Sequence, residues 1–393
     1  MLLPHYRVRM IRWTTRCAVS EYDETCLFAR LTIDLDALVG NVGRYRALAH
    51  GADVAGVVKA DAYGLGFAPV VRAMAGAGVT RFFVTNVVEG AALRAVLPDA
   101  TIYLTNGLPE GAEDAALAAN LSPCLGSLAE LAVWTAVSKR VGRPLPAALH
   151  FDTGISRLGF DSIETAHLLT NADMLDSLDL SLVLSHLACS DEPSHALNDI
   201  QLQRFKRLAA AFPDTPKSLA NSAGVLLGAE YCFDLVRPGY AIYGGNPVVF
   251  EASPVMPVVL AEARVLQVRE VDPGEAAGYG ATWVSSGPRR LATLATGYSD
   301  GYFRWLGSAN GAARAFLGGH YAPVAGRVSM DLLIVDITDL PENAVKRGDF
   351  AELLGPNVPL EEVAAPAGAI GYEVLTSLGN RYTRRYTGAS AES

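Results

Sequence analysis

The stretch from residue 52 to residue 78, ADVAGVVKADAYGLGFAPVVRAMAGAG, predicts one strand followed by one helix. Its first part, up to Lys59, is almost wholly apolar, which is typical of a strand buried on both faces of a sheet. From Ala68 onward, apolar residues recur at the spacing of an amphipathic helix. Lys59 lies where the strand ends. Because most lysines are solvated surface charges, this one needs further signals before it is assigned a function.

The same strand-then-helix unit recurs as far as residue 244. Eight such units predict a closed (β/α)8 barrel, a TIM barrel, in which helices cover the outer face of parallel strands. A doubly wound open sheet is the rival fold, but no strand is followed by G-x-G-x-x-G at the start of a helix. We expect strands at 52–60, 81–86, 101–107, 121–126, 145–154, 180–190, 217–222 and 234–244. We expect helices at 68–78, 87–97, 110–120, 127–140, 162–172, 195–212 and 223–231.

The pattern changes after GGNP, residues 244–247, where short alternating runs bounded by proline, glycine and aspartate replace the β/α units. Alternation with a period of two predicts antiparallel strands. We therefore expect a barrel over residues 31–246 and a mostly antiparallel β domain over 247–386, with a tail over 387–393. The strand ARLTIDL, residues 29–35, precedes the first barrel helix and is a candidate to join the β domain.

Composition narrows the classes of function. The 393-residue chain has a formal net charge of −9, which argues against a nucleic-acid partner. Its five cysteines contain no C-x-x-C pair, which is typical of a reducing compartment, so we expect a cytoplasmic protein without a metal site. No apolar run reaches the length of a membrane span, and we expect no membrane partner. Residues 1–30 carry several arginines but no signal-peptide core, and we interpret them as an extension that need not be ordered.

Polar residues gather at the ends of the predicted barrel strands, where barrel enzymes place their chemistry. These residues are Lys59, Tyr63, Asp152, Arg157, His186, Asn221, Ser222, Arg237, Gly239 and Tyr240. Ser222, Gly239 and Tyr240 follow the seventh and eighth strands, where barrels commonly bind phosphate. A lysine and a phosphate site in one barrel mouth indicate pyridoxal phosphate held as a Schiff base. A Schiff-base aldolase acting on a sugar phosphate is the alternative.

Nine motifs strengthen the first interpretation. In order, they resemble those of the alanine racemase family of fold-type III pyridoxal-phosphate enzymes, and they extend from about residue 30 to residue 386. The motifs are VVKADAYGLG, FDTGISRLGF, LSHLACSD, LANSAG, LVRPGYAIYGG, GYGATW, TGYSDGY, AGRVSMD and GYEVLTSLGNRYTRRY. The resemblance implies a barrel followed by a β domain. It also implies a head-to-tail homodimer in which each active site borrows residues from the partner's β domain.

The resemblance implies a role for each matching residue. Lys59 would carry the cofactor, and Tyr279 would be the second catalytic base, reaching across the interface. Arg157 would contact the cofactor ring oxygen and the substrate carboxylate, which the Met330 amide would also bind, and Asp331 would be a further substrate-binding residue. The residues implied to hold the cofactor are Lys59, Tyr63, Arg157, His186, Asn221, Ser222, Arg237, Gly239, Tyr240 and Tyr372. The residues implied to form the entrance are Asp191, Tyr298, Arg304, Arg327 and Ile370.

Racemisation removes the α proton from one face of an amino acid and returns a proton to the other, which two bases do most simply. Lys59 would serve one face and Tyr279 the other. A free phenol titrates near pH ~10, so Tyr279 needs neighbours that favour its phenolate. His186 and, behind it, Arg237 are the candidates. Because arginine is only a hydrogen-bond donor, Arg237 opposite the ring nitrogen would leave that nitrogen unprotonated and limit side reactions.

One position departs from the family pattern. Two residues before the DTG sequence at 152–154, where many members carry a carbamylated lysine, this chain has His150. A carbamate is anionic and pairs with the arginine of the RLG motif, here Arg157, whereas neutral imidazole cannot. We therefore expect the orientation of Arg157 to come from a bound chloride or from a carboxylate.

The predicted function is interconversion of L-alanine and D-alanine, which supplies D-alanine for peptidoglycan. Tyr372 and Ile370 should crowd the substrate side chain and favour a small amino acid, although a racemase of broader specificity, for serine or others, is an alternative. A fold-type III decarboxylase of diamino acids would need a late catalytic cysteine, whereas the last cysteine here is Cys232. A non-enzymatic pyridoxal-phosphate carrier would resemble the barrel alone, without Tyr279 and Met330.

Overall fold

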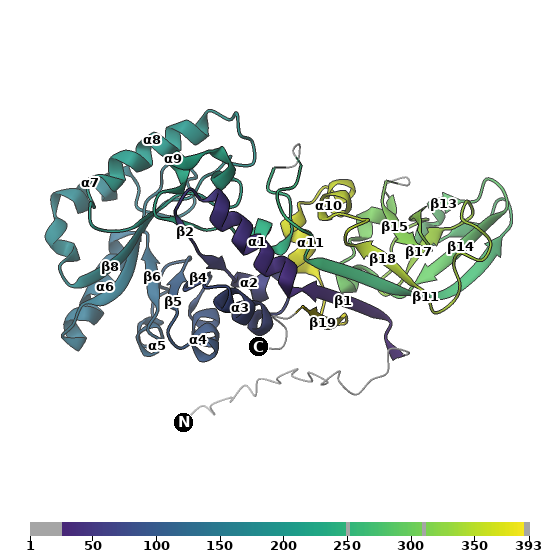
Figure 1. Cartoon of the computed structure of the whole chain (residues 1–393), viewed down its shortest axis with the longest axis horizontal. Coiled ribbons are helices and arrows are strands. Elements are labelled where there is room, and N and C mark those ends of the chain that lie inside the picture. The colour runs from purple at the N-terminus through teal and green to yellow at the C-terminus, as the bar shows by residue number, and fades with distance from the viewer. Residues whose placement is uncertain (1–25, 249–251, 309–311, 389–393) are drawn as a thin grey trace, which may run out of the picture.

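The structure is a computed structural model that describes residues 26–248, 252–308 and 312–388. A barrel and a β domain lie side by side and give the molecule an elongated shape (Figure 1). Residues 1–25 of the predicted extension and 389–393 of the predicted tail lie outside the described residues. Within the described ranges, no helix combines the length and the apolar character that crossing a membrane requires.

Parallel strands form a closed barrel, which confirms the predicted fold class. The strands are β2 (Asp53–Val54), β3 (Gly56–Val57), β4 (Arg81–Val84), β5 (Thr101–Leu104), β6 (Ser122–Leu125), β7 (Leu145–His150), β8 (Leu178–Leu184), β9 (Lys217–Ser218) and β10 (Leu235–Val236). Strands β3 to β9 pair in chain order, and β10 pairs with β2. The Arg237 amide donates to the Ala220 carbonyl at 2.9 Å, and the Ala55 amide donates to the Val236 carbonyl at 2.9 Å. These bonds join the last strands to the first and close the ring.

Helical segments surround the barrel or follow the ends of its strands. They are α1 (Leu35–Leu48), α2 (Lys59–Tyr63), α3 (Phe67–Gly76), α4 (Val87–Val96), α5 (Glu113–Ala118), α6 (Leu128–Val141), α7 (Ser162–Thr170), α8 (Leu197–Ala209) and α9 (Ala229–Cys232), with 3-10 helices η3 (Ala172–Leu175), η4 (Gly224–Leu227) and η5 (Tyr240–Tyr243). Helix α1 comes before the first barrel strand, yet it packs against both α3 and η4. It therefore fills the outer layer between the last β/α unit and the first.

The last two β/α units differ from the prediction. The helix predicted over 223–231 consists of two short pieces, η4 and α9, divided by Gly228. Gly228 has a φ of 134°, which glycine adopts without steric cost and which is incompatible with a continuous α-helix. The strand predicted over 234–244 is reduced to β10 and is followed by η5. Pro238 has no amide hydrogen for a sheet, so strand pairing ends before it.

The β domain is built on one mixed sheet. Its strands are β1 (Ala29–Asp34), β11 (Val259–Val271), β14 (Arg289–Leu294), β15 (Arg314–Leu317), β16 (His320–Pro323), β17 (Leu333–Asp336), β18 (Phe350–Leu354) and β19 (Thr383–Thr387), beside the small hairpin of β12 (Ala276–Ala277) and β13 (Trp283–Val284). Most pairs are antiparallel, as predicted. Strand β1 pairs antiparallel with β11 and parallel with β19, so the strand before the barrel does lie in this sheet.

The end of the described chain connects the two domains. It adds two helices that the sequence analysis did not predict, α10 (Leu360–Ala367) and α11 (Gly371–Ser377), and α11 packs against α2 of the barrel. From β19, the Arg384 guanidinium donates to the Gly64 carbonyl at 2.9 Å, and the Tyr386 hydroxyl donates to the Leu65 carbonyl at 2.9 Å. The loop that follows Lys59 is thus held by the last strand.

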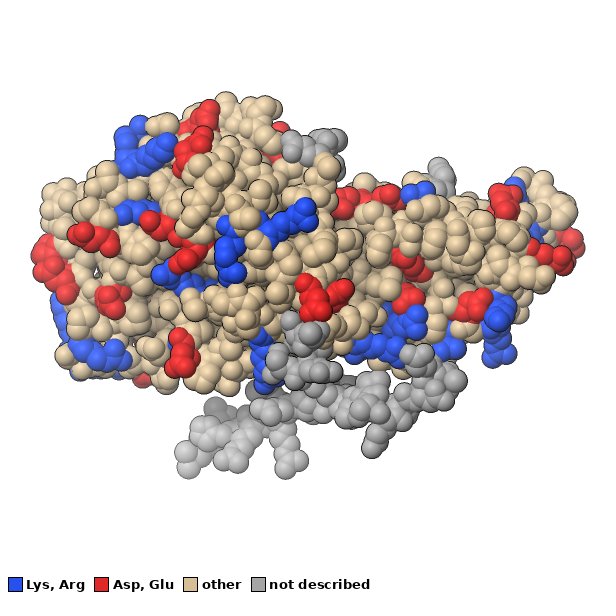
Figure 2. Space-filling model, in the orientation of Figure 1, with Lys and Arg blue, Asp and Glu red and all other residues tan. Residues whose placement is uncertain are grey.

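The surface carries both signs of charge. Acidic and basic side chains alternate over the barrel and the β domain on the face shown in Figure 2. Beneath this surface, buried apolar side chains of the barrel and of the main β sheet form one continuous cluster. The two domains therefore share a core across their boundary, which keeps the mouth of the barrel in a fixed position relative to α11.

Candidate active site

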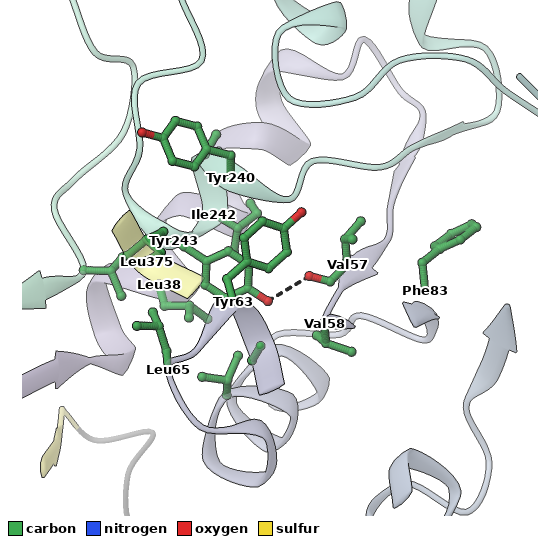
Figure 3. Packing of buried hydrophobic residues seen from close by; sticks show 14 of the residues in the cluster. Leu38, Val57, Val58, Tyr63, Leu65, Phe83, Tyr240, Ile242, Tyr243 and Leu375 are labelled. Atoms are coloured by element: carbon green, nitrogen blue, oxygen red, sulfur yellow. Dashed lines mark hydrogen bonds between the residues drawn. The ribbon is translucent and has the colours of Figure 1, made fainter. Parts of the chain in front are cut away.

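Lys59 begins α2, at the carboxyl end of the first barrel strand. The Val58 amide still donates to the Phe83 carbonyl of β4 at 3.0 Å, so sheet pairing continues up to the residue before the lysine. Tyr243 supports the strand from the other side, because its hydroxyl donates to the Val57 carbonyl at 2.8 Å (Figure 3). The lysine therefore projects from a rigid strand end rather than from a mobile loop, which suits a residue that holds a ligand.

The turn after Lys59 is left-handed. Ala60, Asp61, Ala62 and Tyr63 have φ values of 55°, 55°, 53° and 57°. Residues with a Cβ atom avoid this region at a cost of about 1–2 kcal/mol each, so surrounding contacts must hold the turn. Part of that support is local: the Asp61 carboxylate accepts from the Phe67 amide at 2.8 Å, beyond the turn.

The Lys59 amine is easier to deprotonate than a solvated lysine. Burial lowers its pKa, the neighbouring Arg157 cation lowers it further, and the Glu89 carboxylate opposes both effects. An amine must lose its proton before it can attack an aldehyde or accept a proton from carbon. The surroundings of Lys59 therefore favour the chemical form that both kinds of reaction require.

Ser222, Gly239 and Tyr63 form a small polar cradle beside the lysine. The Ser222 hydroxyl accepts hydrogen bonds from the Gly239 amide at 3.0 Å and from the Ala241 amide at 3.3 Å. A Cβ atom at Gly239 would lie 2.3 Å from the Tyr63 hydroxyl oxygen, so only glycine allows this approach. Backbone amides, a serine hydroxyl and a phenol that converge in this way are typical of a phosphate site.

Aromatic rings extend the cradle toward the β domain. Tyr372 of α11 stacks on Tyr240 with ring centroids 4.0 Å apart, and Tyr63 stacks on Tyr243 at 4.6 Å (Figure 3 shows Tyr63, Tyr240 and Tyr243). The Tyr240 hydroxyl donates to Glu361 of α10 at 3.0 Å. Burial and the charge of Asp191 raise the pKa of Tyr372 to about 12, and burial also raises the pKa of Tyr63. Both phenols are thus kept protonated and can donate hydrogen bonds to an anion.

Arg237 is buried beneath the mouth of the barrel. Its guanidinium donates to the Ser185 carbonyl at 2.6 Å, to the Ser218 hydroxyl and to the Leu219 carbonyl at 3.4 Å. It lies 3.5 Å from Nδ1 of His186. Burial lowers the pKa of Arg237 to about 10, which still leaves it charged at neutral pH. The barrel therefore presents a fixed cation and a pure hydrogen-bond donor at this point.

Two histidines near Arg237 are kept neutral. Burial, followed by the charges of Arg237 and Arg157, lowers the pKa of His186 well below its ordinary value. The same three causes, in the same order, lower the pKa of His150 to about 4. Nε2 of His150 is buried and has no hydrogen-bond partner within the described part of the chain. An orphaned polar atom of this kind marks a place where a small ligand or water can bind.

Two predicted site residues lie in the loops around this centre. Arg157 is exposed, in a loop whose amides at Gly154 and Ile155 donate to the Asp152 carboxylate at 2.8 and 3.0 Å. Asn221 accepts at its side-chain oxygen from the Gly224 amide at 2.8 Å, which connects this residue to the first residue of η4. The structure thus gathers the barrel residues predicted for the site and Tyr372 in one region.

The predicted site residues of the β domain form a second group. Tyr279, Tyr298, Arg304, Met330 and Asp331 are exposed, and Arg327 is partly buried. Ile370 is also exposed, but it directly precedes α11 and lies two residues before Tyr372, so it belongs with the first group. The Met330 carbonyl accepts from Ser299 through its amide at 3.1 Å and its hydroxyl at 2.6 Å, and Asp331 pairs with Arg381 at 2.6 Å. These bonds hold the Met330 loop beside the Tyr298 turn and leave the side chain of Met330 open to a partner.

The two groups are separated within one chain. Tyr279 lies between β12 and β13, and β13 lies in the β domain far from the barrel strands (Figure 1). Its side chain is 69% exposed, which is unusual for a large aromatic ring. A single chain therefore does not bring Tyr279 to Lys59.

Comparison with known proteins decides the family. The sequence model of the alanine racemase N-terminal domain matches residues 33–247, and that of the alanine racemase C-terminal domain matches residues 258–386. The chain belongs to the alanine racemase family. The resemblance predicted from the nine motifs is thereby confirmed.

Relatives within the alanine racemase family match over nearly the whole chain. The alanine racemase of Methylobacterium nodulans is 48% identical over 93% of this chain and 98% of its own length. A biosynthetic alanine racemase of Agrobacterium fabrum is 45% identical over 91% of this chain and 93% of its own length. All four shares exceed nine tenths, so each match includes both the barrel and the β domain of this chain.

Solved structures of the family have the same fold. The alanine racemase of Bartonella henselae, which has covalently bound pyridoxal phosphate, superposes with a TM-score of 0.87 at 39% identity, over 92% of this chain and 99% of the other. The biosynthetic alanine racemase of Pseudomonas aeruginosa superposes with a TM-score of 0.86 at 35% identity, over 92% of this chain and all of the other.

Sequence reasoning missed several residues that support the alanine racemase site. Glu89 binds the backbone next to Lys59, Tyr243 binds the strand before it, and Glu361 fixes Tyr240. Glu89 lies three residues after Asn86, which is the spacing of a capping box. The sequence therefore held a signal that the Glu89 side chain is directed back toward the start of α4. The roles of Tyr243 and Glu361 depend on contacts between distant segments, which no local pattern reveals.

Proposed function

We propose that this protein is an alanine racemase that interconverts L-alanine and D-alanine with pyridoxal phosphate as its cofactor. The observation that carries the proposal is Lys59, a partly buried lysine of lowered pKa at a barrel mouth, next to the cradle of Ser222, Gly239 and Tyr63. Membership of the family supports the activity, and the biosynthetic relatives support a role in supplying D-alanine for peptidoglycan.

The residues present fit pyridoxal phosphate. The Lys59 amine would bind its aldehyde, while the Ser222 hydroxyl, the Gly239 amide and the phenols of Tyr63 and Tyr372 would bind its phosphate. The Tyr240 amide and Asn221 lie in the same loops. Arg237 would face the ring nitrogen and, as a permanent donor, would leave it unprotonated. When bound, the cofactor supplies an electron sink for the charge left by a departing α proton.

Two bases would move the α proton. Nζ of Lys59 would exchange it on one face of the substrate, and the hydroxyl oxygen of Tyr279 from a second copy of the chain would exchange it on the other. His186, neutral and within 3.5 Å of Arg237, would accept a hydrogen bond from that phenol. After one conversion, the base that took the α proton is protonated and the base that gave a proton is deprotonated, so a proton must pass from the first to the second before the same conversion can repeat.

Substrate binding would use both groups of residues. Arg157 from the barrel and the Met330 amide from the second copy would hold the carboxylate, and Asp331 of the second copy would belong to the substrate site. Tyr372 and Ile370 would limit the side chain to a small one. We propose that the residues lining the entrance are Asp191, Tyr298, Arg304, Arg327 and Ile370.

His150 would take the place of the carbamylated lysine common in the family. Its pKa of about 4 leaves the imidazole neutral at pH 7, so it cannot pair with Arg157 as an anion would. Its orphaned Nε2 supports the proposal that a chloride, or a carboxylate, binds between His150 and Arg157 and orients the arginine.

The active unit would be a homodimer with shared sites. The separation of Tyr279 from Lys59 within one chain, and the exposure of Tyr279 and Met330, support this assembly. We further propose a cytoplasmic location, because Cys124 and Cys232 are buried as free thiols, as is usual in a reducing compartment.

The experiment that tests the function combines turnover with chemical labelling. Protein saturated with pyridoxal phosphate should racemise L-alanine without releasing carbon dioxide, and borohydride reduction followed by peptide mapping should find the cofactor on Lys59. Lys59→Ala should abolish both results, whereas Lys139→Ala, at the end of α6, should alter neither. Carbon dioxide release, faster turnover of serine than of alanine, or an unlabelled Lys59 would each contradict the proposal.

A further inference from the structure

Glu89 joins the loops that follow two neighbouring strands of the barrel. One oxygen of its carboxylate accepts from the Ala60 amide at 2.8 Å, and the other accepts from the Thr85 amide at 2.8 Å. Ala60 comes directly after Lys59, and Thr85 comes directly after β4. A single side chain in the first turn of α4 therefore fixes the backbone at the carboxyl ends of both strands.

The start of α4 aims this carboxylate at the two loops. The Asn86 side-chain oxygen caps the helix by accepting from the Val88 amide at 3.0 Å and the Glu89 amide at 3.1 Å. The third residue of a capped helix has its side chain directed back toward the cap, where the acidic group also meets the positive end of the helix dipole. The position of Glu89 is thus set by its own helix, independently of any ligand.

The barrel repeats this arrangement elsewhere. Glu130, in the first turn of α6, accepts from the Leu108 amide at 3.1 Å and the Gly126 amide at 2.8 Å, again in the loops after two neighbouring strands. Glu164 of α7 accepts from the Leu128 amide at 3.0 Å. These carboxylates connect successive loops on the catalytic side of the barrel. Among the three, Glu89 alone binds the backbone next to Lys59.

The loop that Glu89 binds is strained. Ala60 opens the left-handed turn of residues 60–63, and its amide points out of the turn to the Glu89 carboxylate. A left-handed turn of residues with Cβ atoms persists only where its surroundings determine it. Without the Ala60 bond, the turn can relax toward ordinary backbone angles, and the direction of the neighbouring Lys59 side chain changes with it.

The charge of Glu89 acts on the same lysine. It raises the pKa of Lys59 against burial and Arg157, which lower that pKa. Glu89 therefore influences both where the amine stands and how readily it carries a proton.

We propose that Glu89 is a positioning residue for Lys59: its carboxylate holds the left-handed turn in place through the Ala60 amide and so fixes the amine at the barrel mouth. The inference rests on the proposed function in one respect, namely that Lys59 carries the cofactor. It adds a residue that touches neither cofactor nor substrate and acts through the backbone of another element.

The test compares Glu89→Gln with Glu130→Gln in the full-length, cofactor-loaded protein. Both changes keep the size of the side chain and replace one acceptor oxygen by a donor NH2 group, which cannot accept from an amide. Both variants should lose thermal stability to a similar extent. Glu89→Gln should in addition lower kcat about tenfold or more with little change in KM, because a small displacement of a reacting group costs far more in rate than in binding.

Hydrogen exchange gives the readout that does not depend on turnover. In Glu89→Gln, amides of a peptide covering residues 58–66 should exchange faster than in the unchanged protein. In Glu130→Gln, faster exchange should be confined to the loops around Leu108 and Gly126, with kcat within about twofold of the unchanged protein. Should Glu89→Gln fail to fold, Glu89→Asp and Glu130→Asp provide the same comparison, because the shorter side chain cannot reach both amides.

Three results would overturn the proposal. They are a Glu89 variant that keeps its kcat, equal loss of kcat in the two variants, and loss of kcat without faster exchange at residues 58–66. The proposed function fails on a different result, namely unchanged protein that does not racemise alanine. In that case the exchange comparison still decides whether Glu89 holds the turn.

Discussion

Burial fixes the protonation states of the side chains around Arg237. The guanidinium stays charged with a pKa near 10, while His150 and His186 stay neutral because a second cation in the same apolar region would be costly. Neutral imidazoles beside a permanent cation give a site whose charge changes little between pH 6 and pH 8. The chemistry at the barrel mouth therefore depends on Lys59 and on the phenols, rather than on histidine titration.

His150 should make the protein less stable in mild acid. Its pKa is about 4 in the folded protein and about 6.5 when solvated, so between these values the unfolded chain binds a proton that the folded chain does not. The free energy of unfolding should therefore fall as pH drops from 6.5 to 4, by about 2 kcal/mol at pH 5. Urea unfolding at pH 7.5 and pH 5, at fixed protein and cofactor concentrations, measures this fall.

The control for this prediction is a second histidine. His150→Gln should reduce the difference in stability between the two pH values by about the same 2 kcal/mol. His320→Gln, at an exposed position of β16, should leave the difference unchanged. An identical pH dependence in the unchanged protein and in His150→Gln would show that His150 titrates normally.

Tyr279 should be needed for one direction of proton transfer. Tyr279→Phe removes only a hydroxyl, so cofactor content should stay the same while racemisation falls by about a hundredfold or more. Because Lys59 would still serve one face, solvent deuterium should enter one enantiomer of alanine much faster than the other, as measured by mass spectrometry. Tyr321→Phe, an exposed tyrosine of β16, is the matched control and should behave like the unchanged protein. Equal exchange into both enantiomers of alanine in Tyr279→Phe would contradict the assignment.

Among single residues, the sequence was enough to predict the candidate site residues that directly follow the barrel strands. Lys59, Ser222 and Arg237 could be found because parallel strands bring their carboxyl ends to one edge, so position along the chain indicates position in the site. Glu89 resembled an ordinary charged residue on a helix surface, since its value comes from two amides in other segments. The neutrality of His150 depends on burial and on two arginines, which the sequence does not reveal.

Among the elements, the left-handed turn of α2 is the one that sequence propensity would not produce. Ala60 and Asp61 occupy backbone angles that glycine adopts without cost, yet neither position has glycine. The turn is therefore held by its contacts with α4, with Phe67 and with β19 rather than by its own residues.

The left-handed turn should tolerate glycine at position 60 without loss of stability. Ala60→Gly should leave the free energy of unfolding within about 0.5 kcal/mol, because relief of the left-handed backbone offsets the greater freedom of glycine in the unfolded chain. Ala91→Gly, at an exposed position inside the right-handed helix α4, should cost about 1 kcal/mol. Chemical unfolding of the two variants measures the difference. A greater loss for Ala60→Gly than for Ala91→Gly would contradict the prediction.

Element boundaries were predicted well where local patterns decide them. The helix predicted over 127–140 corresponds to α6, which has a serine cap at its start and glycine after its end. Strand β10 was predicted too long because Pro238 ends the pairing within an otherwise apolar run. Helices α10 and α11 were missed because they are short and lie in a region whose strands dominated the pattern. Tertiary contacts stabilise them, since α11 packs on α2 of the barrel and α10 packs on α11.

At the scale of the whole molecule, the two proposed bases lie apart within one chain. Lys59 is at the barrel mouth, and Tyr279 is on the β domain (Figure 1). For both proposed bases to serve one site, a second copy would have to supply Tyr279, and in a closed dimer each copy would supply the other.

Mixing two inactive variants tests this arrangement. Lys59→Ala and Tyr279→Phe should each have little activity alone. Hybrid dimers formed by co-expression should contain one site with both Lys59 and Tyr279 intact, so a random mixture should recover about a quarter of the unchanged activity. Hybrids purified through two different affinity tags have one intact site in every dimer and should recover about half. If both residues acted within one chain, every site would lack one of them and no activity would return.

The overall architecture was predictable because the pattern of apolar residues differs between the two parts of the chain. Alternating strands and helices over residues 52–244 could only form a parallel sheet with helices outside, and the later runs of period two could only form antiparallel strands. The pairing of β1 with β19 was beyond such reasoning. It joins segments about as far apart as the described chain allows, and no local pattern specifies a partner at that distance.

The position of β19 also sets the timing of assembly during translation. A ribosome makes Lys59 and its turn early, but it makes Arg384 and Tyr386, which anchor the following loop, after every other described element. A nascent chain can therefore close its barrel while the reactive lysine still lacks its final support. Competence for chemistry should arrive with the last strand synthesised, so a partly made chain would not yet present a finished site to free vitamin aldehydes in the cell.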